Sequence, residues 1–258
     1  MKRTFVYIIS ISLTMHLMPA AAQQADLPVD TADVTLKIRT ALEISGPILF
    51  FTDKNILNLE ANVTADLNEK YSLIVGGGYS DYSYSQYNYS FMADGLFFKA
   101  GADRNLLRPE MAEGTYWAGA GLRYGVSRFA AETPTLKHDN YWGSVPSSIP
   151  RDNYWCHYLE VSGGFKAELF RNFSIGWMIN IRKMIYAGGS RELRPIYFPG
   201  YGNGGSTFAY SINYFISYNI PYKKIKVLIY PEPPEEPDEE DTGQQGASPQ
   251  VGRQGIGR

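Results

Sequence analysis

The chain has 258 residues and a formal net charge of −2 at pH 7, so its charge does not favour nucleic-acid binding. It has a single cysteine, Cys156, which cannot form a disulfide within the chain, and 20 tyrosines, which favour strands and membrane–water interfaces. Its length suits one sizeable domain. After the N-terminal segment the sequence has no apolar run long enough for a membrane helix, so any membrane span must be a β-barrel.

The first 22 residues have the three-part pattern of a secretory signal peptide. Two basic residues follow the initiator methionine, an apolar run extends to Met18, and an Ala-rich cleavage site ends at Ala22. The apolar run is too short for a membrane helix, and no cysteine follows it to mark a lipoprotein. The sequence therefore predicts a signal peptide over 1–22 and an N-terminal linker over 23–33.

The next part of the chain alternates apolar and polar residues over long segments. Such a period of two is typical of strands and not of helices. Each segment is near the roughly 9–11 residues that a tilted strand needs to cross a bilayer. The pattern predicts an all-β fold, an eight-stranded antiparallel up-and-down transmembrane β-barrel over 34–219. The segments are 34–44, 57–67, 71–82, 95–104, 115–127, 154–169, 173–183 and 206–218.

Long and short connections alternate between these segments. Transmembrane barrels have short periplasmic turns and longer outer loops. With the N-terminus in the periplasm, the long connections would all face outward. The short connections are 68–70, 105–114 and 170–172, and the long ones are 45–55, 83–94, 128–153 and 187–205.

The character of the chain changes at residue 220. A basic and apolar stretch is followed, over 231–241, by four prolines and seven acidic residues. Such a composition cannot bury a core. Residues 220–258 are therefore predicted to be a disordered or extended periplasmic tail, either a solvated extension or a tether for a basic partner.

Alternation alone does not say which face is inside, because a soluble lipocalin-like barrel would bury the apolar parity. Aromatic residues near strand ends, glycines on the polar parity and a balanced set of charges favour a polar interior and a lipid-facing apolar surface. The predicted interface aromatics are Tyr116, Tyr124, Trp155, Phe173, Trp177 and Tyr218. The predicted lumen charges are Lys37, Arg39, Lys99, Arg123, Lys166 and Arg182 against Glu43, Glu60, Asp66, Asp103, Glu160 and Glu168.

These charges could plug the lumen or line a narrow channel. The interior of an eight-stranded barrel is only wide enough to be filled by side chains. We therefore expect a filled lumen and keep a narrow, porin-like pore as the alternative.

An outer-membrane enzyme acting on lipid A or peptides would need a histidine with a Ser or Asp partner. The predicted mature chain has His138, which precedes Asp139 in a long connection, and His157, which is near Trp155 on the apolar parity. We interpret them as a solvated pair and an interfacial residue. The sequence therefore predicts a non-enzymatic protein without a catalytic, cofactor-binding or metal site, with a hydrolase or acyltransferase as the alternative.

Three stretches, 121–129, 172–177 and 197–202, resemble an uncharacterised family of small bacterial outer-membrane barrels, known only as a domain of unknown function. The resemblance extends over about 41–218, and it implies the barrel and the membrane but no substrate. We therefore expect a scaffold or accessory subunit of an outer-membrane complex, such as one for outer-membrane protein biogenesis. Its expected contacts are outer-membrane lipid and protein partners at 128–153, at 187–205 and at the periplasmic tail, with no nucleic acid.

Overall fold

The computed structural model describes residues 30–107, 115–140, 143–189 and 193–229. The predicted signal peptide and the acidic part of the tail lie outside these ranges. None of the helical segments among the described residues combines the length and the apolar character needed to cross a bilayer.

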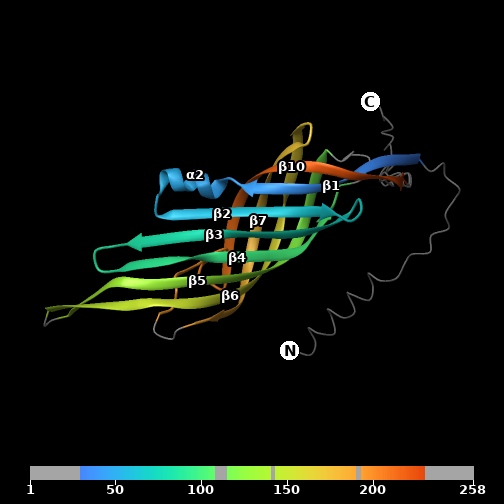
Figure 1. The fold of residues 1–258 in the computed structure, drawn as a ribbon. Helices are drawn as coiled ribbons and strands as arrows, with labels where there is room; N and C mark the ends of the chain where they lie inside the picture. Colours follow the sequence, from blue (N-terminus) through green and yellow to red (C-terminus); the bar gives the residue numbers. More distant parts are fainter. Residues whose placement is uncertain (1–29, 108–114, 141–142, 190–192, 230–258) are drawn as a thin grey trace, which may run out of the picture. The chain divides into compact units, whose positions relative to one another are not determined.

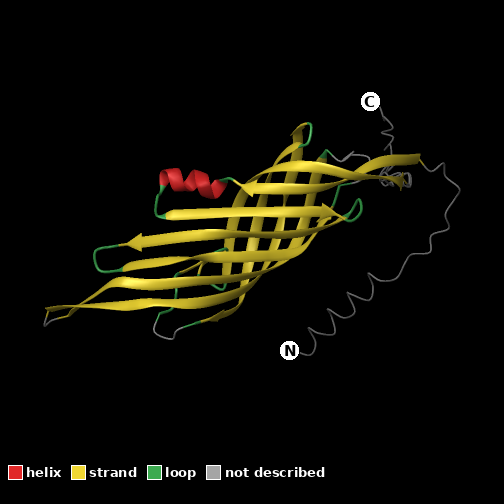
Figure 2. Ribbon diagram, in the orientation of Figure 1, coloured by secondary structure: helices red, strands yellow, loops and turns green. Residues whose placement is uncertain are grey.

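Eight long antiparallel strands close into a barrel in the order β1-β10-β7-β6-β5-β4-β3-β2 (Figures 1 and 2). Each strand therefore pairs with its neighbours in the chain, and the last long strand returns to the first. This confirms the predicted eight-stranded up-and-down barrel. The strands are β1 (Asp30–Glu43), β2 (Ile56–Asp66), β3 (Tyr71–Ser85), β4 (Ser90–Asn105), β5 (Tyr116–Asn140), β6 (Gly143–Phe170), β7 (Phe173–Gly188) and β10 (Phe208–Ile229).

The barrel buries its polar parity and exposes its apolar parity. On β5, Arg123 is 3% exposed and the adjacent Leu122 is 56% exposed. On β6, Glu160 is fully buried and Val161 is 52% exposed. A soluble barrel would show the reverse, because water would surround its outer face. The arrangement is that of a bacterial outer-membrane β-barrel, whose outer face contacts lipid.

A short helix, α2 (Ser45–Thr52), replaces the predicted loop between β1 and β2. The Glu43 carboxylate caps it by accepting hydrogen bonds from the Ser45 hydroxyl and from the Gly46 backbone N–H at 3.0 Å. Gly46 lies so close to β2 that an added Cβ would meet the Asn58 carbonyl oxygen at 2.0 Å. The cap and the close approach fix the start of the helix to the barrel.

The connection predicted over 128–153 is largely an extension of β5 and β6. Their pairing continues to Asn140 opposite Gly143, so the two strands form a hairpin that projects beyond the neighbouring strands (Figure 1). The β3–β4 turn braces this hairpin through a bridge from Tyr89 to Leu136 and a hydrogen bond from the Lys137 N–H to the Asn88 carbonyl at 2.8 Å. The hairpin is therefore a structured element and not a lid over the barrel.

The strands at the two ends of the barrel segment are also longer than predicted. β1 starts at Asp30, before the predicted barrel boundary at 34, and β10 continues to Ile229, past the predicted boundary at 219. The Tyr222 hydroxyl donates to the Asp66 carbonyl at the end of β2, so this part of β10 contacts the barrel. The basic stretch predicted to start the tail is thus strand as far as Ile229.

Candidate functional site

The middle of the lumen is organised around Glu160 on β6. Its carboxylate accepts hydrogen bonds from Arg182 Nε at 2.6 Å, Arg123 Nη1 at 3.2 Å and Lys99 Nζ at 3.3 Å. The strand register explains why the two guanidinium groups lie beside this carboxylate, because Arg123 of β5 and Arg182 of β7 are both directly opposite Glu160. The ladder therefore places one buried carboxylate between two guanidinium groups.

Two further carboxylates complete this central cluster. Glu60 lies 2.7 Å from Lys99 Nζ, and Asp103 lies 3.2 Å from Arg123 Nη2. The cluster thus contains as many anions as cations, which buried charges require because an unpaired charge there would be strongly unfavourable. Its members are Glu60, Lys99, Asp103, Arg123, Glu160 and Arg182.

A second group of charges lies near the short turns at 67–70 and 171–172. Arg39 forms a bidentate pair with Asp66, at 2.5 and 2.7 Å. Lys37 pairs with Glu168, which also accepts a hydrogen bond from Asn219 Nδ2 at 3.2 Å. These contacts join β1, β2, β6 and β10, so they help to close the barrel where its first and last strands meet.

Two of the predicted lumen charges have other roles. Glu43 caps α2, as described above. The Lys166 ammonium lies 4.5 Å from the centre of the Trp117 ring, and none of the described carboxylates forms an ion pair with it. The predicted lumen residues include equal numbers of cations and anions, but not every cation forms an ion pair.

The loop between β7 and β10 (the inserted loop) folds into the mouth of the barrel at the end where α2 lies. It contains the short strands β8 (Tyr197–Phe198) and β9 (Gly202–Asn203). Phe198 is 3% exposed and packs edge-on against Phe129, with ring centres 5.1 Å apart. Tyr201 is fully buried, and its carbonyl accepts a hydrogen bond from Arg182 Nη1 at 3.2 Å. Phe198 and Tyr201, within the stretch 187–205 predicted as a partner surface, are thus buried, whereas Arg194, Ile196 and Asn203 are exposed. A partner at this stretch stays a prediction.

The inserted loop is held by tyrosines. The rings of Tyr82 and Tyr197 stack with their centres 4.5 Å apart. The Tyr201 hydroxyl donates to the Ser206 carbonyl at 2.8 Å. Burial raises the pKa of the Tyr197 and Tyr201 phenols above their ordinary value. Both groups therefore stay protonated at neutral pH and keep their ability to donate.

The cavities inside the barrel differ in size. Two small cavities, of about 40 and 10 Å³, are lined by Arg39 and Lys166. A larger cavity of about 510 Å³ opens at the mouth where α2 lies, between this helix and the inserted loop, and it reaches Glu60 and Arg182.

The predicted interface aromatics point away from the lumen. Tyr116, Tyr124, Trp155, Phe173, Trp177 and Tyr218 are each between 39% and 49% exposed. The Tyr124 hydroxyl lies 2.8 Å from His157 Nδ1, so this histidine contacts an interfacial tyrosine on the outer face. The backbone of His138 and Asp139 belongs to β5, but their side chains lie outside the described part of the chain. No group of three His, Cys, Asp or Glu residues in the described ranges is placed to hold a metal ion.

Sequence reasoning missed two features of this surface. The helix α2 exposes Ile48, Leu49 and Phe51, which are 57%, 56% and 85% exposed. Beside it, an apolar groove of about 910 Å³ lies over the outward faces of β2, β3 and β4. Ala61 and Gly77 are small residues on the apolar parity, but Ala65, Ala100 and Ala120 are too, so the sequence alone gives no specific signal for the groove.

Comparison with protein families gives one match, to the domain of unknown function DUF6048, over residues 4–225. No curated protein matches the chain. Similar solved structures include CarO of Acinetobacter baumannii, which is 10% identical, with a TM-score of 0.37 over 73% of this chain and 98% of that one. Another is Ail, the attachment invasion locus protein of Yersinia pestis (8% identity, TM-score 0.32, 76% and 99%). A third is the outer membrane protease OmpT of Escherichia coli (11% identity, TM-score 0.32, 82% and 100%).

Proposed function

Since the chain belongs to the DUF6048 family, whose function is unknown, we infer its role from the barrel itself and propose a non-enzymatic scaffold or accessory subunit of an outer-membrane complex. The filled lumen is the observation that carries this proposal. Glu160 is fully buried among three cations, and the inserted loop occupies the mouth above it. A barrel filled in this way offers its surfaces, and not a channel, for function.

The β5–β6 hairpin is the surface that we propose for a partner. Among the described residues, β6 has no pairing with β7 beyond Trp155, which is opposite Gly188, so the projecting part of the strand has an edge without a paired neighbour there. An exposed strand edge can accept an extended segment of another protein through backbone hydrogen bonds. Asp152 and Asn153 are exposed near the base of this edge and would add contacts between side chains.

We propose that the hairpin and α2 face the cell exterior and that both chain ends lie in the periplasm. The short turns at 67–70 and 171–172 are at the end of the barrel opposite α2 (Figure 1). Short turns on the periplasmic side are usual for bacterial outer-membrane barrels. The tail after residue 229 would then be available to a second, periplasmic partner.

The scaffold role can be tested by shortening the hairpin. Residues 135–147 are replaced by a two-residue turn, which keeps the paired positions Thr133 and Ile149. The tagged chain is cross-linked in cells and purified in mild detergent. We expect a partner to co-purify with the unchanged chain and to be lost with the shortened hairpin. A matched control changes Glu69 and Lys70 at the opposite end to alanine and should retain the partner.

Three outcomes would count against the scaffold. A barrel that purifies alone, without any cross-linked partner, would contradict it. Conductance of the unchanged chain in planar bilayers, increased in Arg123→Ala, would instead support the pore alternative. Altered lipid A or lost proteolysis on replacing His138 or His157 would support an enzyme.

A further inference from the structure

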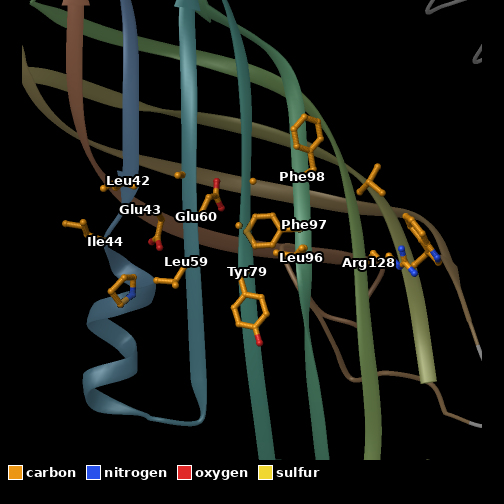
Figure 3. Close-up of a pocket in the computed structure, with 16 residues that line it drawn as sticks. Leu42, Glu43, Ile44, Leu59, Glu60, Tyr79, Leu96, Phe97, Phe98 and Arg128 are labelled. Atoms are coloured by element: carbon orange, nitrogen blue, oxygen red, sulfur yellow. The ribbon is translucent and has the colours of Figure 1, made fainter. Parts of the chain in front are cut away.

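The apolar groove on the outer face of the barrel arises from the order of side chains across neighbouring strands. In register, Leu42 is opposite Ala61, Ala61 is opposite Gly77, and Gly77 is opposite Phe98. All four residues are on the outward parity. Two small residues between two large ones leave a depression in the lipid-facing surface, with a volume of about 910 Å³ (Figure 3).

The depression continues along the barrel as a slot. A second cavity, of about 500 Å³, shares Ala61, Gly77 and Phe98 with the first and extends past Val63 and Val75 toward Tyr218. Its outward-facing walls are mostly apolar. An elongated apolar slot on a surface that faces lipid suits an alkyl chain, which gains from burial there and has no polar group to leave unpaired.

One end of the slot carries a cation. In the row next to Ala61 and Gly77, Leu96 is opposite Arg128, and Arg128 is opposite Trp155. The Arg128 guanidinium carbon lies 5.3 Å from the centre of the Trp155 ring. Arg128 is exposed, and no ion pair joins it to a carboxylate in the described ranges. Figure 3 shows Arg128 across the strands from α2 and the first part of the groove.

Arg128 also marks the outer limit of the apolar band. On β5 the outward residues from Tyr116 to Val126 are apolar or aromatic, and Arg128 is the next outward position. Tryptophan and cationic residues at such a limit lie at the level of lipid headgroups. An arginine there can bind a phosphate through charge-assisted hydrogen bonds.

We propose that this groove is a binding site for lipid A, the acylated and phosphorylated lipid of the outer leaflet. An acyl chain occupies the slot over Ala61 and Gly77, and a phosphate of the headgroup binds Arg128. The inference rests on the outer-membrane location proposed above, but it does not depend on the scaffold role. Purification of the unchanged chain without any partner would contradict the scaffold role but would leave this inference unaffected.

The test measures lipid A bound to the full chain, refolded in phosphatidylcholine vesicles and analysed by native mass spectrometry after mild extraction. Ala61→Phe fills the slot with an apolar side chain that the lipid face tolerates. Arg128→Gln removes the charge with little change in length. We expect each substitution to weaken lipid A binding about tenfold, the loss that corresponds to one charge-assisted hydrogen bond or to a blocked site.

Two matched controls lie on the same outward surface. Ala120→Phe adds the same ring to an exposed alanine outside the groove. Arg104→Gln removes an arginine whose guanidinium carbon lies 5.8 Å from the centre of the Tyr71 ring, at the other end of the band. Both controls should bind lipid A as the unchanged chain does. Folding of every variant is checked by the gel shift between heated and unheated samples, and Arg128→Gln decides the test if Ala61→Phe does not fold.

Three results would overturn the proposal. They are equal lipid A binding by Arg128→Gln and Arg104→Gln, undiminished binding of lipid A that lacks its phosphates, and equal competition by phosphatidylglycerol. The last result would mean that the groove accepts any anionic lipid and that lipid A is not its specific occupant.

Discussion

Glu160 is the residue on which most of the lumen charge depends. It accepts hydrogen bonds from Lys99, Arg123 and Arg182, so Glu160→Gln leaves three buried cations with two carboxylates. Removing one partner of a buried ion pair costs about 3–5 kcal/mol, because the other charge remains unpaired. We expect a loss of that size in the free energy of unfolding, measured by urea titration of the barrel in lipid vesicles.

The control for this prediction is Glu132, whose carboxylate is partly exposed and lies 3.7 Å from Arg151 Nη1. An exposed pair contributes only about 0–1 kcal/mol, so Glu132→Gln should change the unfolding free energy little. Equal effects of the two substitutions would mean that the lumen is hydrated enough to screen its charges.

The inward position of these residues can be predicted from the sequence, but their partners cannot. A period of two places Arg123, Glu160 and Arg182 on one face, because alternate side chains of a strand point the same way. Pairing depends on the register between strands, which shifts near the end of β6 between Glu168 and Phe170. A count of charges also cannot show that Lys166 contacts Trp117 instead of a carboxylate.

The inserted loop depends on a glycine at its tip. Gly200 has a φ of +73°, and a Cβ there would meet the Phe97 ring at 2.4 Å. Gly200→Ala therefore strains the backbone and clashes with a lumen residue, so we expect the loop to leave the mouth while the strands stay paired. Limited proteolysis should then cut within 193–207, and the gel shift of the folded barrel should persist.

Gly205 provides the comparison for this element. Its φ is not positive, and an added Cβ would meet only Asn203 Oδ1, at 3.2 Å. Gly205→Ala should therefore leave the loop resistant to protease. A loop that is equally resistant in Gly200→Ala would show that its aromatic contacts hold it without the turn.

Three elements escaped prediction for separate physical reasons. α2 consists largely of apolar residues, so it shows no helical alternation, and its cap comes from Glu43 on the preceding strand. The segment 128–153 contains Pro134, Pro146 and Pro150, which a central strand would not accommodate, but the projecting hairpin lacks the second neighbouring strand that a proline would disrupt. The loop at 187–205 was expected outside because strand periodicity says nothing about how a connection folds back.

At the scale of the whole molecule, the distribution of side chains inverts that of a soluble barrel. Leu122, Val161 and Ile181 are opposite one another on β5, β6 and β7 and are 56%, 52% and 41% exposed. Arg123, Glu160 and Arg182 are one position away and buried. Exposing the first row to water would be unfavourable, whereas a bilayer accommodates it. The fold therefore requires a membrane. The effect of a charged substitution on stability should depend on how deep the substituted residue lies in the bilayer.

Depth dependence gives the sharpest test of this inversion. Leu122 lies in the middle of the outward apolar run of β5, and Leu169 lies beside the turn at the end of β6. In lipid vesicles we expect Leu122→Arg to lower the unfolding free energy by about 2–4 kcal/mol and Leu169→Arg by about 0–1 kcal/mol. Both leucines are similarly exposed, at 56% and 55%, so a soluble barrel would tolerate both substitutions equally. Equal and small losses in urea titrations would contradict a bilayer around the barrel, because water offers no gradient of polarity along a strand.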